Sequence, residues 1–312
     1  MSAAPRATRA ARLSLACGHE IALSEVERFP SADRDRASGN YTLVVVHGGP
    51  GLSDHSEIFS GITPVLEMCP SIDRLVFYDQ LGCGASDSPM DAALYTLENY
   101  VSELDQVVSW ASKSDGGRGV ALLGHSWGGQ IVLELLLTRA PAELAAVRCG
   151  IVVSAPLDES TYAARQQQMR DALDPATRAF LAEDERSRIA DGSSGALAYR
   201  TLIGESDAAV TGSMQGWAAL PRLEALARPA LLLCGGAHDT VPHQEYLALA
   251  ARAEQHARGA AGAGAGALRA RVLPDAGHAA FFEPGARGAV FAAVESFVRT
   301  CEGDGKGRDA SS

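Results

Sequence analysis

The stretch VALLGHSWGGQIVLELLL, residues 120–137, decides the fold of this 312-residue chain. It begins with a short apolar run, residues 120–123, of the kind that forms a strand buried on both faces of a parallel sheet. The run ends in Gly124-His125-Ser126-Trp127-Gly128, which fits the pattern G-x-S-x-G, and an apolar helical segment follows at once. A serine between such a strand and such a helix occupies a strained turn that lifts its hydroxyl above the sheet. The sequence therefore predicts a nucleophile at Ser126.

Three further apolar runs end in glycine-containing turns and predict neighbouring strands. These runs are residues 41–46, 75–78 and 230–234. Residues 97–108 carry apolar side chains at three- and four-residue steps, which is the pattern of an amphipathic helix. Strands that alternate with helices favour an α/β fold with a mostly parallel central sheet flanked by helices.

One segment breaks this alternation. Residues 156–220 are rich in charge and helix formers and contain no clear strand. We interpret them as a helical cap inserted between a first core part, residues 1–155, and a second core part, residues 221–300; crossover helices of a larger sheet are the alternative. The Gly/Ala-rich residues 258–267 predict a surface loop, and the polar tail, residues 301–312, predicts disorder.

Composition excludes several kinds of partner. A net charge of −11 at pH 7 repels nucleic-acid phosphates, and no apolar run approaches the roughly 20 residues of a membrane-spanning helix. The six cysteines form no C-x-x-C pair, which favours reduced thiols in a cytoplasmic protein over a disulfide framework or a zinc site. The first 15 residues contain three arginines and no acid. We expect a frayed basic N-terminus there, with an organelle transit peptide as the alternative.

A serine nucleophile needs a base, and the base needs an orienting acid. Asp239 and His278 each lie in a loop that follows an apolar run. Loops at the carboxyl ends of parallel strands meet at one edge of the sheet. We therefore predict that Ser126, Asp239 and His278 converge as a catalytic triad, with His238 as a rival base and Asp275 as a rival acid. These groups, together with backbone amides, are sufficient without a metal or an organic cofactor.

Two backbone N–H groups are candidates for an oxyanion hole. Trp127 directly follows the nucleophile at the start of a helix, and Gly49 lies in the glycine-rich loop 47–51. A plain tight turn is the alternative reading of that loop. Gly48 beside it is a candidate for substrate binding. The Trp127 side chain is either a wall of a small apolar pocket or an ordinary core residue.

Three motifs taken together resemble the proline iminopeptidase family of α/β-hydrolases. They are HGGPG at residues 47–51, DQLGCGAS at residues 79–86 and GHSWGG at residues 124–129. The resemblance spans roughly residues 40–300 and implies an α/β-hydrolase fold with a helical cap. The chain order serine, acid, histidine is the one that this fold uses. It also implies that the substrate is a short peptide or a related small molecule from which an N-terminal residue, often proline, is released.

By the same resemblance, carboxylates hold the free α-amine of the substrate. Residues 205–212 resemble the part of the cap that supplies one carboxylate, which implies this role for Asp207 with Glu205 in reserve. Solvated surface charges are the alternative for both. Some members carry a second carboxylate directly after the triad aspartate, where this chain has Thr240. A hydroxyl carries no charge to pair with an ammonium group, so a single carboxylate would hold the amine less firmly.

The sequence as a whole predicts a serine hydrolase that cleaves the bond after an N-terminal residue through an acyl-enzyme. One alternative is an amino-acid amidase or esterase of specialised metabolism. Another is a binding protein without catalysis, since hydrolase folds also serve as receptors. Epoxide hydrolase and dehalogenase chemistry normally needs a carboxylate nucleophile, and residue 126 is a serine.

Overall fold

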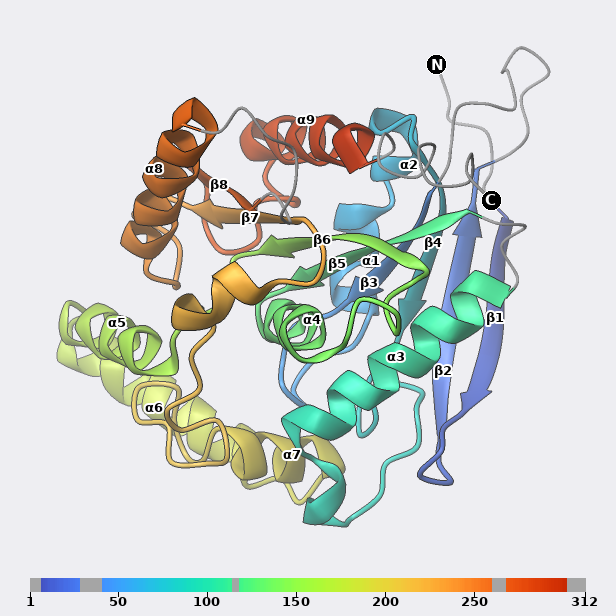
Figure 1. Ribbon diagram of the computed structural model, residues 1–312. Coiled ribbons are helices and arrows are strands. Elements are labelled where there is room, and N and C mark those ends of the chain that lie inside the picture. Colours follow the sequence, from blue (N-terminus) through green and yellow to red (C-terminus); the bar gives the residue numbers. More distant parts are fainter. Residues whose placement is uncertain (1–6, 29–40, 114–117, 260–267, 302–312) are drawn as a thin grey trace, which may run out of the picture.

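The computed structural model describes residues 7–28, 41–113, 118–259 and 268–301, and its central feature is one sheet. The sheet has eight strands in the order β1-β2-β4-β3-β5-β6-β7-β8 (Figure 1). From β4 through β8 the neighbours are parallel, whereas β2 pairs antiparallel with β1 and β4. The strands are β1 (Ala7–Ser14), β2 (Glu20–Glu27), β3 (Tyr41–Val46), β4 (Ile72–Tyr78), β5 (Gly119–His125), β6 (Val147–Val153), β7 (Ala230–Gly235) and β8 (Leu268–Leu273).

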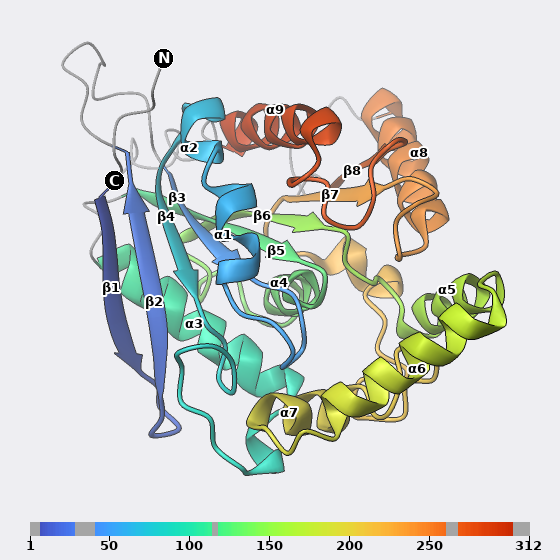
Figure 2. The same cartoon turned by 180° about the vertical axis from the view of Figure 1, so that it is seen from behind.

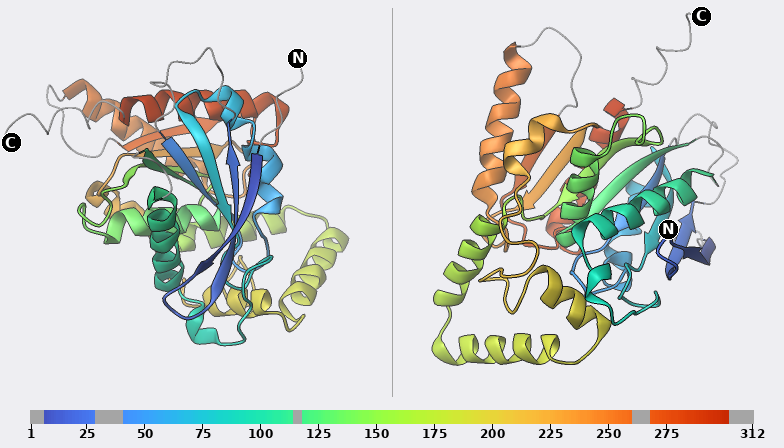
Figure 3. Two further views of the ribbon diagram at one scale, coloured as in Figure 1. Left: turned by 90° about the vertical axis from the view of Figure 1, so that its right-hand side faces the viewer. Right: turned by 60° about the horizontal axis from the view of Figure 1, so that its bottom comes forward.

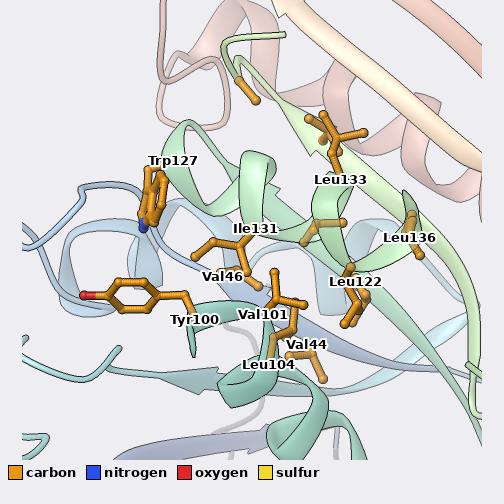
Figure 4. Packing of buried hydrophobic residues seen from close by; sticks show 14 of the residues in the cluster. Val44, Val46, Tyr100, Val101, Leu104, Leu122, Trp127, Ile131, Leu133 and Leu136 are labelled. Carbon is orange, nitrogen blue, oxygen red and sulfur yellow. The ribbon is translucent and has the colours of Figure 1, made fainter. Parts of the chain in front are cut away.

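Helices cover both faces of this sheet, which explains why all six residues of β3 are buried (Figures 1 and 2). Val44 and Val46 face one layer, and Leu43 and Val45 face the other. Figure 4 shows the first layer, in which side chains of α3 and α4 pack over Val44 and Val46. The first layer consists of α3 (Leu97–Lys113), α4 (Trp127–Thr138) and α8 (His243–Gly259), and the second of α1 (Ser56–Ile62), α2 (Val65–Met68) and α9 (Pro284–Cys301). The predicted α/β architecture is confirmed.

Residues 156–220 contribute no strand to the sheet. They contain α5 (Glu159–Asp171), α6 (Pro175–Ile189) and α7 (Ser194–Leu202), and the 3-10 helix η2 (Leu220–Ala225) begins at their end. Their only β pairings are two isolated bridges. The three helices lie together beyond one end of the sheet (Figure 3). Because α5 follows β6 directly, this end is the one where the parallel strands finish.

The N-terminal segment corrects one prediction. Residues 7–14 are not frayed but form the edge strand β1, which pairs along its whole length with β2. Arg12 helps to hold β1 in place, because its guanidinium contacts Glu20 at 3.2 Å and Asp87 at 2.9 Å. Charged side chains on an edge strand also discourage pairing with a second chain. Residues 1–6, to which the transit-peptide alternative also applies, lie outside the described residues.

Two predicted irregular segments are only partly described. Helix α8 continues to Gly259, so the first two residues of the Gly/Ala-rich segment 258–267 are helical and the others lie outside the described residues. Cys301 ends α9, and the rest of the tail lies outside them too. All six cysteines are free, and Cys17 alone among them is exposed. No helix in the described ranges has both the length and the apolar character that crossing a bilayer requires.

Gly128 shows how closely α4 approaches the sheet. A Cβ atom added there would lie 2.2 Å from the carbonyl oxygen of Val46 and 2.5 Å from that of His47. Because both obstacles are backbone atoms, α4 would have to move away from β3. We therefore expect Gly128→Ala to lower the free energy of unfolding by about 3 kcal/mol, which urea denaturation would measure.

Gly288→Ala is the matched control for this prediction. Gly288 lies inside α9, and no atom lies within 4 Å of a Cβ added there. The same substitution should therefore raise the stability by about 0.5–1 kcal/mol, because alanine favours a helix interior. Equal effects of the two substitutions would contradict the close approach at Gly128.

Candidate active site

Ser126 stands at the sharp turn between β5 and α4. Its backbone has φ 53° and ψ −123°, a conformation that residues with a side chain rarely adopt. The turn is held by the Ser126 N–H, which donates to the Val153 carbonyl at 2.9 Å, and by the Gly129 N–H, which donates to the Ser126 carbonyl at 2.8 Å. Strain of this kind persists only where the surroundings enforce it and is frequent at active sites.

Asp239 and His278 are brought together from loops that follow β7 and β8. His278 Nδ1 lies 2.9 Å from Asp239 Oδ1, and the aspartate is fully buried. Among the described residues, no hydrogen bond joins the Ser126 hydroxyl to His278. Asp239 and His278 are thus paired in this structure, whereas no such bond links His278 to the Ser126 hydroxyl in the part of the chain that the structure describes.

The Asp239 carboxylate is held in its charged form. Burial alone would raise its pKa, but the hydrogen bond and charge of His278, together with hydrogen bonds from Ser154 and Val241, outweigh burial and hold the pKa well below its usual range. Ser154 Oγ donates to Asp239 Oδ2 at 2.6 Å, and the Gly235 N–H donates to the same oxygen at 2.8 Å. An anion fixed in this way can orient the imidazole and stabilise its protonated form.

His125 connects the Ser126 turn to the loop that carries His278. It precedes Ser126 in the chain, and its Nε2–H donates to the His278 carbonyl at 3.0 Å. The two imidazole rings lie 4.9 Å apart between centroids. Burial, with a smaller effect of the His278 charge, lowers the pKa of His125 to about 3, so its ring is neutral at physiological pH. The residue therefore anchors the His278 loop beside Ser126 without competing as the base.

The two rivals for the acid and base roles lie at the surface. His238 and Asp275 are exposed, although each is close in sequence to a candidate triad residue. The geometry brings Asp239, and not Asp275, to His278.

The glycine-rich loop after β3 lies against the nucleophile turn. A Cβ added to Gly48 would lie 3.5 Å from Ser126 Cβ, and one added to Gly49 would lie 3.6 Å from Trp127 Cδ1. Gly49 also has φ 141°, which favours glycine. The loop and the first residue of α4 thus lie close together beside Ser126, which is the arrangement that the predicted oxyanion hole requires.

Gln80 joins these two sides. Its Nε2–H donates to the His47 carbonyl at 2.8 Å, and its Oε1 accepts from the indole Nε1–H of Trp127 at 2.9 Å. The Gln80 N–H also donates to His47 Nε2 at 3.1 Å, which leaves the proton of His47 on Nδ1, 2.7 Å from the Gly48 carbonyl oxygen. All three side chains are buried. Burial lowers the pKa of His47 to about 4, so the ring stays neutral in this network.

The Trp127 side chain is a core residue. It is 1% exposed, and the Tyr100 ring meets it edge-on with 5.7 Å between centroids (Figure 4). Of the two readings of this side chain, the structure favours core packing over a pocket wall. Its backbone N–H, at the N-terminus of α4, keeps the position expected of an oxyanion donor.

The two carboxylates predicted to hold a substrate amine differ in their surroundings. Asp207 is half-buried and accepts a hydrogen bond from the Tyr199 hydroxyl at 2.7 Å, whereas Glu205 is exposed. Burial raises the pKa of Asp207, with a further increase from the Glu185 charge. The Thr240 hydroxyl lies 2.9 Å from His278 Nδ1, and its carbonyl accepts a hydrogen bond from Gln166 of α5 at 3.0 Å.

One group in the described part of the chain has the spacing of metal ligands: Asp54, His55 and Asp79. The contacts within it are already made, because His55 Nδ1 lies 2.6 Å from Asp79 Oδ1 and the Ala85 N–H donates to Asp79 Oδ2 at 2.8 Å. These bonds tie the loop after β4 to the start of α1, which is a structural role.

Sequence reasoning missed three residues of the site. Ser154 bonds Asp239, Gln80 bonds both His47 and Trp127, and Glu159 is a buried carboxyl that bonds Gln130 of α4. Ser154 could have been found, because it directly follows an apolar run. Gln80 lies in a quoted motif whose role the pattern does not reveal. Glu159 has no local signal, since its partner Gln130 is 29 residues away.

Comparison with known proteins gives concordant results. A family model described as the alpha/beta hydrolase family matches residues 43–293. A proline iminopeptidase of Heyndrickxia coagulans is 25% identical over 251 residues, which cover 71% of this chain and 84% of that protein.

Two solved structures share the fold. The proline iminopeptidase of Mycobacterium smegmatis has a TM-score of 0.65 at 19% identity, with 94% of this chain and 99% of that chain covered. An esterase of Pyrococcus furiosus has a TM-score of 0.62 at 15% identity, with 96% and 92% covered. The predicted resemblance to proline iminopeptidases and the predicted α/β-hydrolase fold are both confirmed. Because the family model matches most of its length, the chain belongs to the alpha/beta hydrolase family.

Proposed function

We propose that this hydrolase cleaves the peptide or amide bond after an N-terminal residue, such as proline, through an acyl-enzyme on Ser126. The observation that carries this proposal is the buried Asp239–His278 pair at the end of the sheet where Ser126 occupies its strained turn. The sequence similarity to proline iminopeptidases supports the substrate class. The substrate is a short peptide or a related small molecule, and we place the activity in the cytoplasm.

In the proposed reaction, His278 Nε2 takes the proton of the Ser126 hydroxyl while Oγ attacks the carbonyl carbon. Asp239 keeps the Nδ1 proton in place and balances the imidazolium charge. The backbone N–H groups of Trp127 and Gly49 bind the oxyanion, each contributing a factor on the order of 10²–10³ in rate. His278 then gives its proton to the leaving amine. A water molecule, activated by the same imidazole, hydrolyses the acyl-enzyme and frees Ser126.

The base must first reach the nucleophile for this reaction to start. His278 Nδ1 is shared between Asp239 and Thr240, which leaves Nε2 as the nitrogen that can turn toward Ser126. Catalytic hydrogen bonds are often long before substrate binds and shorten in the complex.

An amino-acid amidase or esterase is the second candidate function. It is favoured by Thr240, which puts a neutral hydroxyl directly after the acid, and by the structural likeness to an esterase. The same acyl-enzyme chemistry serves both functions, so the leaving group and the substrate amine decide between them.

A panel of substrates separates the candidates. We expect proline and alanine p-nitroanilides to be hydrolysed with kcat/KM at least tenfold above their N-acetylated forms, because cap carboxylates attract a free ammonium group. Simple p-nitrophenyl esters and amino-acid amides are measured beside them. Hydrolysis of esters alone would favour the esterase, and preference for amides the amidase. No turnover of any member, with no labelling by a fluorophosphonate, would leave only a binding protein.

A further inference from the structure

A pocket of about 60 Å³ lies between helix α3 and the turn that joins β1 to β2. This volume admits roughly four water-sized groups, at roughly 10–15 Å³ each. Leu15 of the turn, Leu81 of the loop after β4 and Leu94 supply apolar lining, and α3 supplies polar side chains, Glu103 among them. Among the described residues that line the pocket, none belongs to the predicted triad. The pocket is therefore separate from the candidate active site.

Glu103 brings a buried, unpaired carboxylate oxygen to this pocket. The residue is only 3% exposed, and its Oε2 accepts a hydrogen bond from the Leu81 N–H at 3.0 Å. Its other oxygen, Oε1, has no partner among the described residues. The pKa of the Tyr78 hydroxyl is raised by burial and then by the Glu103 charge, and this oxygen also has no partner in the described part of the chain. Because an unpaired buried polar atom is costly, the site suits a ligand that donates hydrogen bonds.

The surroundings of Glu103 favour a positively charged ligand. Burial raises its pKa to about 8, and the hydrogen bond from the Leu81 N–H only partly opposes this increase. Of the described residues, no cationic side chain acts on this carboxyl group. A cation bound beside Glu103 would lower its pKa and keep the carboxylate charged. The pocket thus offers a buried acid whose positive partner the described residues do not supply.

The outer side of the pocket is held in place by hydrogen bonds. The Ala16 N–H donates to Gln106 Oε1 at 2.8 Å, which ties the turn between β1 and β2 to α3. Gln106 Nε2 in turn donates to the Ser102 carbonyl at 3.1 Å. Cys17 lies in the same turn and also lines the pocket. Its thiol is free and exposed, whereas the other five cysteines are buried. Modification of one thiol can therefore report whether the pocket is occupied.

We propose that this pocket is a binding site for a short primary alkylammonium ion. The ammonium group donates a charge-assisted hydrogen bond to Glu103 Oε1, and the alkyl chain packs against Leu15, Leu81 and Leu94. The volume limits the ligand to about four non-hydrogen atoms, as in n-propylammonium. No step of the proposed hydrolysis uses Glu103, so the two proposals stand separately. A pocket that holds only water is the alternative.

Protection of Cys17 against alkylation tests this proposal. The rate at which iodoacetamide modifies Cys17 is measured by mass spectrometry in the presence of n-propylammonium or of n-propanol, its neutral analogue. We expect the ammonium ion to protect the thiol at a concentration about 10- to 100-fold lower than the alcohol, because hydrogen bonds between charged groups are the stronger ones. An ammonium ion bound at the candidate active site would not slow this reaction.

Three variants locate the ligand, and thermal unfolding checks that each one folds. Glu103→Gln keeps an acceptor for the Leu81 N–H but removes the charge, so it should abolish the preference for the ammonium ion. Ser102→Leu places a larger side chain in the pocket and should prevent protection by either ligand. Glu98→Gln is the matched control, because Glu98 is an exposed acid of the same helix that pairs with Arg139, and it should behave as the wild type. Equal protection by the two ligands, or an unchanged preference in Glu103→Gln, would overturn the proposal and leave water as the occupant.

A second measurement uses the wild-type protein alone. n-Propylammonium keeps its charge up to about pH 10, as a lysine side chain does. From about pH 6.5 to about pH 8.5, the ratio of the unprotected to the protected rate should increase as Glu103 loses its proton, and n-propanol should show no such change. The other titratable groups that face Glu103 are Tyr78, Cys83 and Tyr100, and burial raises the pKa of each above this range, so they stay neutral. A ratio that does not change with pH would overturn the proposal.

Discussion

Ser126→Ala is expected to lower kcat by a factor on the order of 10⁶ while the fold remains intact. The substitution removes only the Oγ atom, which makes no hydrogen bond among the described residues. The backbone bonds that hold the turn, from the N–H of residue 126 to Val153 and from Gly129 to residue 126, are unaffected. The loss should therefore appear in catalysis and not in stability.

Hydrolysis of an ester or an aminoacyl p-nitroanilide measures this loss, and thermal unfolding checks the fold. Ser112→Ala is a suitable control, because Ser112 lies in α3 and bonds only the Ser109 carbonyl at 3.0 Å. It should keep full activity and full labelling by a fluorophosphonate. If Ser126→Ala retained a tenth of the activity, another nucleophile would have to be sought.

Asp239→Asn is expected to lower kcat by about 10⁴-fold. Both carboxylate oxygens accept hydrogen bonds. Oδ1 accepts from His278, and Oδ2 accepts from Ser154 and Gly235. An asparagine must direct its NH₂ group at one of these sets of donors. If NH₂ faces His278, the imidazole adopts the wrong tautomer; if it faces Gly235, two N–H groups oppose each other.

The lowered pKa of Asp239 determines how its contribution to the free energy of unfolding depends on pH. Its pKa in the folded state lies below the unfolded value of about 3.9. The charged carboxylate therefore stabilises the fold above about pH 3.9, and this contribution is lost only as the pH falls below that value. Asp239 thus stays charged over the whole pH range in which activity would be measured.

Asp275→Asn is the control for Asp239→Asn, because Asp275 is the exposed rival acid, and it should leave kcat unchanged. A loss of about 10⁴-fold in that variant instead would transfer the role of the acid to Asp275.

The strands that could be predicted are those whose burial is visible in the residue types of one short stretch of sequence. Strands β3, β5 and β7 are buried on both faces and appear as continuous apolar runs. Strands β1 and β2 could not be predicted because they lie toward the sheet edge and carry both polar and apolar side chains. Whether these segments form strands therefore depends on contacts with residues far away in the sequence. The Arg12 contacts with Asp87, 75 residues away, show this dependence.

The same distinction holds within the site. Ser126, Asp239 and His278 could be proposed because each lies where a strand ends, and this position is visible locally. Glu159 could not, because a charged residue at a helix start is normally a solvated one. Only the folded chain brings Gln130 to it and buries its second oxygen. Its burial and its hydrogen bond to a residue far away in the sequence, rather than its residue type, distinguish it from the other acids of residues 156–220.

Few other residue types could replace Gln80 during the evolution of this hydrolase. The position requires a side chain that donates at one end and accepts at the other, to reach His47 and Trp127 at once. Glutamate only accepts, methionine offers no strong donor, and asparagine is shorter by one methylene group. Each of these three replacements therefore loses at least one of the two bonds that hold the His47 loop to Trp127. Natural variation in substrate range should accumulate in the helices above the sheet, while this amide stays unchanged through the lineage.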